Sequence, residues 1–148
     1  MDNITYKQID LSIEQRIIEL FGDWTKSYLH QEEGCFTLVA LDGDEPIGFI
    51  STNPAQFPEP LSDSKDAYIG VIEVAEKYRR KGIASRLIQN TESWAREYGY
   101  KQIRAWSSQD KKEAIPMWYV LNYCMCPARI WVEWCQKVVD GFYVAKML

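Results

Sequence analysis

The chain has 148 residues, of which 47% are hydrophobic, 14% aromatic and 26% charged, and its formal net charge is −4 at pH 7. This length predicts a single domain over residues 1–148, with enough apolar side chains to bury a core. The acidic balance argues against sequence-independent binding of nucleic acid, and the lack of an apolar run near 18 residues argues against a membrane span.

The first predicted elements are a strand and a helical region. Residues Ile4 to Ile9 alternate between apolar and polar side chains, which is typical of a half-buried strand. Ser12 to Gln15 forms a capping-box pattern that predicts the start of a helix, and Gly22-Asp23 predicts a break. One long or two short helices are therefore expected, with an apolar face formed by Ile13, Ile17, Leu20, Phe21, Trp24 and Tyr28.

A hairpin and a long loop follow. Phe36 to Leu41 and Ile47 to Thr52 are rich in strand-forming residues, and the segment 42–46 between them contains the turn signals Asp, Gly and Pro. Residues 53–65 include three prolines and form a loop of a length that is uncommon unless it is functional or disordered. We expect this loop to form a rim of a ligand site.

A strand, a basic loop and a helix are predicted over residues 67–98. Ala67 to Val74 has strand composition, and the apolar residues after Gly82 recur with a helical period. The first N–H groups of a helix have no internal acceptor, and the helix dipole adds about half a positive charge there. With four cations directly before it, at Lys77, Arg79, Arg80 and Lys81, the junction predicts a phosphate-binding site; a solvated basic turn is the alternative.

The remaining sequence predicts the end of the preceding helix, one further helix and three strands. Gly99 is expected to end the preceding helix, and 102–107 is a strand pattern. Residues 111–121 have a helical pattern in which Pro116 must either kink the helix or lie in its first turn. The tail predicts strands over 128–134 and 142–147, separated by a turn at Asp140-Gly141.

Cysteine and histidine usage is sparse. The four cysteines, Cys35, Cys124, Cys126 and Cys135, include no C-x-x-C pair, and His30 is the only histidine. We therefore expect no metal site and reduced thiols. Residues 1–7 have neither a basic nor an apolar leader region, so we expect no signal peptide and a cytoplasmic location.

Charge is distributed unevenly along the chain. Residues 1–66 carry 13 acidic and 4 basic side chains, whereas residues 67–148 carry 8 acidic and 13 basic side chains. The basic half suits a polyanionic ligand. The acidic half suits a cationic ligand, with an ordinary solvated surface as the alternative.

The basic loop resembles a known signature. Arg79 to Ala84 fits the [Q/R]-x-x-G-x-[G/A] pattern of the GNAT superfamily of acyl-CoA-dependent N-acetyltransferases, and Val74 and Tyr78 stand where that family has a valine and an aromatic residue. The predicted element order also resembles that of the family over nearly the whole chain. The resemblance implies an α/β (α+β) fold in which helices flank a mixed, mostly antiparallel sheet of seven strands.

The resemblance further implies acetyl-CoA as the cofactor. In this family the pantetheine arm enters between the fourth and fifth strands, and the pyrophosphate binds the loop and the following helix. Carried onto this sequence, the cofactor-binding residues are Ile72, Val74, Arg79, Arg80, Lys81, Gly82, Ile83, Ala84 and Ser85. A backbone N–H near Val74 would polarise the thioester carbonyl.

The first of two candidate catalytic residues is a base. An alkyl ammonium has a pKa near 10.4, so a base must deprotonate an amine acceptor at pH 7, and Glu73 is the nearest carboxylate in the motif strand. Its neighbours Ile72 and Val74 should face the other side of the sheet; an ion pair with a nearby cation is the alternative role for Glu73.

The general acid departs from the family pattern. Many members carry N-x-x-A-I-x-x-Y after the fifth strand, and their tyrosine protonates the CoA sulfur. Aligned on Ala114-Ile115, the asparagine position here is Lys111 and the tyrosine position is Trp118, whose indole cannot act as an acid. Tyr119 could replace it if the helix is shifted by one residue; a packed aromatic is its alternative role.

The resemblance implies an enzyme that transfers an acetyl group from acetyl-CoA to a primary amine by direct attack in a ternary complex. The acceptor is expected to be a small molecule or a peptide, and family analogy places a homodimer contact on the last strands. The departure at Trp118 keeps open a catalytically weak acyl-CoA sensor of the same fold. A site for another phosphate ligand, such as a nucleotide, is a third reading.

Overall fold

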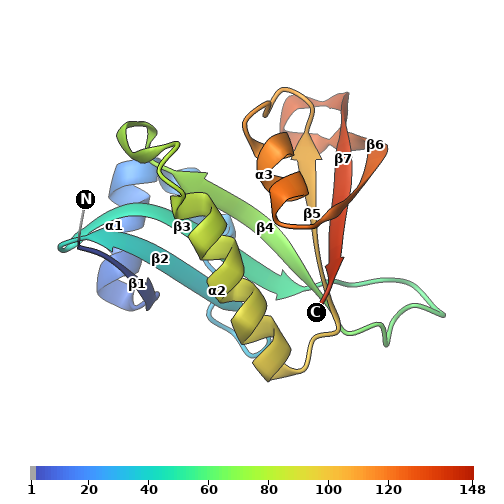
Figure 1. The fold of residues 1–148 in the computed structure, drawn as a ribbon, viewed down its shortest axis with the longest axis horizontal. Helices are drawn as coiled ribbons and strands as arrows, with labels where there is room; N and C mark the ends of the chain where they lie inside the picture. The colour runs from blue at the N-terminus through green and yellow to red at the C-terminus, as the bar shows by residue number, and fades with distance from the viewer. Residues whose placement is uncertain (1–2) are drawn as a thin grey trace.

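The computed structural model describes residues 3–148 and contains one seven-stranded sheet with helices on both faces (Figure 1). The strands are β1 (Ile4–Gln8), β2 (Phe36–Asp42), β3 (Glu45–Pro54), β4 (Asp66–Val74), β5 (Gln102–Ser108), β6 (Cys124–Val132) and β7 (Lys137–Met147). The helices are α1 (Leu11–Phe21), α2 (Ile83–Tyr98) and α3 (Ala114–Val120), with short 3-10 turns η1 (Asp23–Ser27), η2 (Glu76–Tyr78) and η3 (Glu133–Cys135). Over the described residues, no helix has the length and apolar character needed to cross a membrane.

The sheet order is β1-β2-β3-β4-β5-β7-β6, and all neighbours are antiparallel except β4 and β5. The predicted fold class, a mixed and mostly antiparallel seven-stranded sheet with flanking helices, is confirmed. The hairpin is also confirmed, with both strands longer than predicted and the turn at Gly43-Asp44. Gly43 has φ +59°, a left-handed conformation that suits glycine.

The predicted capping box is wrong. Helix α1 begins at Leu11, and its N-cap is Asp10, whose carboxylate accepts a hydrogen bond from the Ile13 N–H at 2.9 Å. Asp10 and Ser12 are both favourable capping residues, so composition alone could not choose between them. The break at Gly22-Asp23 is confirmed, because α1 ends there and the short turn η1 follows.

The predicted turn at Asp140-Gly141 is also wrong. These residues lie inside β7, and the chain turns instead at η3 and Gln136. Gly141 is needed for a packing reason: a Cβ there would stand 2.4 Å from the Ser107 carbonyl oxygen and 2.7 Å from the Trp106 ring. Glycine in a strand thus marks a close approach of neighbouring groups here, not a turn.

Two apolar clusters pack on opposite faces of the sheet. One joins the inner side chains of α2, including Leu87 and Ile88, to Ile69 and Ile103 of the central strands. The other joins α1 to β2 and β3 through Ile17, Val39 and Phe49, among others. Figure 1 shows α2 across the front of the sheet and α1 behind it.

Candidate functional site

Strands β4 and β5 are paired at one end and apart at the other. Their parallel pairing covers only Asp66 to Tyr68 on β4 and Gln102 to Arg104 on β5. A bulge begins directly afterwards, because Thr52 pairs with Ile69 and Ser51 with Val71, which leaves Gly70 without a partner on β3. A bulge bends its strand and increases the local twist, so the strands diverge beyond it (Figure 1).

The gap holds a cleft of about 1190 Å³. Its walls are residues 69–74 of β4, residues 105–108 of β5, the start of α2, and the segment 110–118 that leads into α3. From Ile69 onward β4 has no partner on its β5 side, so backbone N–H and C=O groups face the cleft. An extended ligand can add to this edge as a strand would.

The N-terminus of α2 opens into the same cleft. Gly82 is the N-cap, with φ +78°, and no side chain caps this end of the helix. The first intrahelical bond runs from the Arg86 N–H to the Gly82 carbonyl at 3.0 Å, so the amides of Ile83, Ala84 and Ser85 have no partner within the helix. Because the first turn also carries no acidic residue, this end suits an anion.

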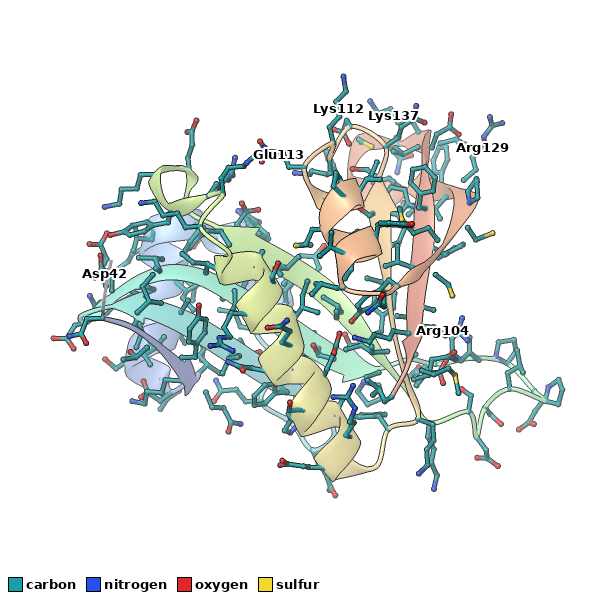
Figure 2. All side chains as sticks on the ribbon, viewed as in Figure 1. Asp42, Arg104, Lys112, Glu113, Arg129 and Lys137 are labelled. Atoms are coloured by element: carbon teal, nitrogen blue, oxygen red, sulfur yellow. The ribbon has the colours of Figure 1, made fainter. Side chains whose placement is uncertain are left out.

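The basic residues of the loop occupy different places. Arg80 lines the cleft, and its guanidinium lies 3.8 Å from the carboxylate of Glu113, which is labelled in Figure 2 and belongs to the opposite wall. Arg79 also lines the cleft, but its Nε donates to the Val74 carbonyl and its Nη2 donates to Glu73, both at 3.0 Å. Arg79 therefore ties the loop to the end of β4.

Lys81 does not line the cleft. Its ammonium lies 5.2 Å from the centre of the Tyr78 ring, and Lys77 lies 4.9 Å from the same ring. The Tyr78 hydroxyl donates to Asp42 at 2.7 Å, and this hydrogen bond raises the pKa of Tyr78 above its ordinary value. Tyr78 thus anchors the basic loop to the end of β2, where Figure 2 labels Asp42.

Glu73 lies on the face of the sheet that carries α1. It stands directly opposite Phe49 of β3, whereas Ile72 and Val74 belong to the cluster under α2. This alternation is the one expected from the sequence. Glu73 is among the residues that line the cleft, and its carboxylate is paired with Arg79, so the structure contains the ion pair named above as its alternative role.

The α3 wall presents Trp118 and not Tyr119. Trp118 is only 2% exposed, lines the cleft and packs edge-on against Tyr123 with ring centres 4.8 Å apart. Tyr119 is 77% exposed and is not among the lining residues. Pro116 lies in the first turn of α3, where proline is tolerated, so it supplies no kink that would shift the register.

Several lining residues were not singled out from the sequence. Asp110, Lys112 and Glu113 form the wall opposite the basic loop, and Trp106 lines the cleft from β5. The charged run before α3 was the available signal, but nothing in the sequence places it against Arg80. The predicted rim loop, residues 53–65, does not line this cleft; its first part borders a second cavity.

Known proteins are similar to this chain in sequence and in fold. Residues 5–123 match the sequence model of the Acetyltransferase (GNAT) family. N-acetyltransferase 8 of Rattus norvegicus is 27% identical over 102 residues, a match that covers 69% of this chain and 45% of that protein. The chain therefore spans less than half the length of this curated relative.

Solved structures share the fold over nearly the full chain. An N-acetyltransferase from Staphylococcus aureus Mu50 superposes with a TM-score of 0.80 at 15% identity, and the alignment covers 99% of each chain. Arabidopsis thaliana NAA60, solved in complex with acetyl-CoA, superposes with a TM-score of 0.78 at 16% identity over 99% of each chain. At 15–16% identity, these similarities show that the fold is shared and do not extend to activity.

Proposed function

Because the chain belongs to the acetyltransferase (GNAT) family, we propose that it binds acetyl-CoA in the cleft between β4 and β5 and transfers the acetyl group to a primary amine. One observation carries this proposal. The uncapped N-terminus of α2 and the unpaired edge of β4 open into the same cleft, one suited to a phosphate group and the other to an extended amide chain.

The cofactor-binding residues divide into three roles. Ile72 and Val74 offer backbone groups of β4 to the pantetheine arm, and an N–H near Val74 polarises the thioester carbonyl. The amides of residues 80–85 receive the pyrophosphate. Arg80 supplies charge next to it, Lys81 contributes at longer range, and Arg79 holds the loop against β4 through its bonds to Val74 and Glu73.

Glu73 is the proposed base. The amine nitrogen forms a bond to the carbonyl carbon, the C–S bond breaks, and its electron pair leaves on the CoA sulfur. Before attack, one proton passes from the ammonium nitrogen to Glu73, directly or through water; after the C–N bond forms, the nitrogen loses a second proton, and the sulfur takes up one proton, directly or through solvent. The Arg79 guanidinium, 3.0 Å from the Glu73 carboxylate, holds this side chain in place beside the cleft.

The general acid would come from α3. Tyr119 could protonate the sulfur only if α3 turned by about 100° on binding, one residue of a helix. Without an acid, a thiol of pKa near 8.5 still leaves as a thiolate, and the reaction is slower. A slow enzyme and an acyl-CoA sensor would therefore differ only in the rate of acetyl transfer at this site.

Turnover separates these two functions. Isothermal titration should give saturable acetyl-CoA binding, and a thiol assay should detect CoA release with members of a panel of small and peptide amines. We expect Glu73→Gln to lower kcat by about 100-fold or more and Glu76→Gln, an exposed carboxylate outside the cleft, to leave it unchanged. Binding without release across the panel would favour the sensor, and absence of binding would refute both.

Two further assignments rest on analogy. A homodimer would use the edge strand β6 and the turn η3, where Trp131 and Trp134 are exposed. A cytoplasmic location agrees with four cysteines that are all free thiols. Light scattering of the purified chain tests the dimer.

A further inference from the structure

The basic loop and the α3 wall face each other across the cofactor cleft, and one ion pair joins them. The Arg80 guanidinium lies 3.8 Å from the carboxylate of Glu113, the residue directly before α3, and both residues line the cleft. Over residues 3–148, no other hydrogen bond or ion pair links residues 75–85 to residues 105–120. Figure 2 shows Glu113 between the loop and α3. The ion pair therefore bridges the two walls of the cleft.

Arg80 carries the most available charge of the loop. The other cations have partners elsewhere, since Arg79 donates to the end of β4 and two lysines lie over the Tyr78 ring. Within the part of the chain that the structure describes, the Arg80 side chain makes no hydrogen bond to the protein, and it is 78% exposed. A phosphate group that enters the cleft would thus meet a free set of arginine donors with Glu113 beside it.

The loop holds Arg80 in place without this ion pair. Its φ is +64°, a left-handed conformation that is sparsely populated for residues with a side chain and persists where neighbouring contacts impose it. Such contacts come from the two preceding residues, because Tyr78 is bonded to Asp42 and Arg79 to the end of β4. Removal of the Glu113 charge should therefore leave the loop where it is.

A phosphate group and a carboxylate compete for the same guanidinium. Both are anions that arginine binds through its planar set of donors, and a phosphate forms charge-assisted hydrogen bonds that are shorter than this 3.8 Å ion pair. Both side chains of the pair are exposed, and an exposed ion pair contributes little free energy. A diphosphate can therefore displace Glu113 from Arg80, with an affinity reduced by the strength of the pair.

We propose, on the basis of the function proposed above, that Glu113 competes with the cofactor for Arg80 and thereby lowers the affinity for the diphosphate group that acetyl-CoA and CoA share. Binding breaks the ion pair, and release of CoA allows it to form again. Only molecules in which Arg80 is unpaired bind at full affinity, so the apparent affinity falls with the fraction that is unpaired. Glu113 thus sets cofactor affinity and takes no part in acetyl transfer.

The first test measures binding at low ionic strength by isothermal titration. Glu113→Gln keeps the size of the side chain and removes its charge, so we expect the Kd values of acetyl-CoA and CoA to fall by the same factor, about two- to fivefold, the range set by exposed ion pairs. S-acetylpantetheine, which has no phosphate group, should bind both proteins equally in an NMR titration. An equal gain for S-acetylpantetheine, or no gain for CoA, would overturn the competition.

The second test separates the ion pair from the general effect of removing a negative charge. Asp110→Asn makes the same change of charge on the same wall, but Asp110 is bonded to Ser108 and not to Arg80, so it should tighten CoA binding less. In an Arg80→Gln background the partner is absent, and Glu113→Gln should no longer tighten binding. A gain of the same size with and without Arg80 would refute the competition.

The two proposals fail in different ways, and inorganic pyrophosphate separates them because it needs only the basic loop and the start of α2. If pyrophosphate binds Glu113→Gln more tightly than the wild type but acetyl-CoA neither binds nor is consumed, the proposed enzyme function fails and the competition stands. If acetyl-CoA is bound and consumed with amines but Glu113→Gln changes the affinity for neither acetyl-CoA nor pyrophosphate, the enzyme function stands and the competition is refuted.

Discussion

The cofactor cleft, where β4 and β5 part, and the second cavity, at the end where these strands are paired, are built from different kinds of group. The cleft offers backbone amides and the edge of a strand from the segment between Ile69 and Ser85, and its other walls come from β5 and the segment leading into α3. The cavity offers side chains from four separate segments around Arg104. A backbone site recognises what all members of a family bind, whereas a side-chain site can change with each sequence.

The largest expected effect concerns the α3 wall of the cleft. Trp118→Ala removes a buried indole that packs on Tyr123, so we expect the free energy of unfolding to fall by about 3–5 kcal/mol. Tyr119→Ala is the matched control, because this neighbour is exposed, and it should change stability by no more than about 0.5 kcal/mol. Chemical denaturation measures both; equal losses would show that α3 packs through the other face.

The next effect concerns the link between the two halves of the sheet. Lys146 of β7 and Tyr123 donate to the buried carboxylate of Glu92 on α2, at 2.9 and 3.0 Å. Lys146→Met leaves that carboxylate with one fewer partner, so we expect a loss of about 2 kcal/mol in unfolding free energy. Lys137→Met, on an exposed residue of the same strand, should leave the unfolding free energy unchanged. An unchanged value for Lys146→Met would mean that the bond from Lys146 to Glu92 does not stabilise the fold.

A smaller change tests the backbone character of the cleft. Gly82 and Gly43 both have positive φ, and a Cβ on either would meet no atom within 4 Å. Valine at either position should therefore cost about 1–2 kcal/mol through left-handed strain alone. Only Gly82→Val should also weaken acetyl-CoA binding, by about tenfold or more, as measured by titration; the same loss in Gly43→Val would assign the effect to general instability.

The contrast between the two sites also explains what the sequence could predict. The strand, the glycine and the cations of residues 67–85 are contiguous, so their local chemistry predicted a phosphate site before any fold was considered. Hydrophobic periodicity likewise predicted the sheet and the helices that carry it. Local patterns suffice where the interacting groups are close in the chain.

The cavity and the tail depended on contacts between distant residues. Arg104 contacts Asp66 and Phe57, which lie 38 and 47 positions earlier in the chain, so no motif marks these contacts. The turn predicted at Gly141 is wrong because the Trp106 ring that requires glycine there belongs to another strand. The sequence likewise does not predict the hydrogen bonds of Arg79 to Val74 and Glu73, because a cation in a basic loop is expected to contact the ligand.

The smallest expected effect concerns Tyr100, which lines neither the cleft nor the second cavity. The Tyr100 hydroxyl donates to the Gly34 carbonyl at 2.6 Å, and burial raises the pKa of Tyr100 to about 12. Between pH 10 and 12 the folded state keeps a proton that the unfolded state loses, so the stability from this group is present below pH 10 and is lost as the pH rises toward 12. Tyr100→Phe should cost about 1 kcal/mol at pH 8 and should reduce the fall in Tm between pH 9 and pH 11. Its acetyl-CoA affinity at pH 8 should equal that of the wild type, because the hydroxyl faces Gly34 and not the cleft; a Tm profile parallel to the wild type would assign the alkaline instability to another tyrosine.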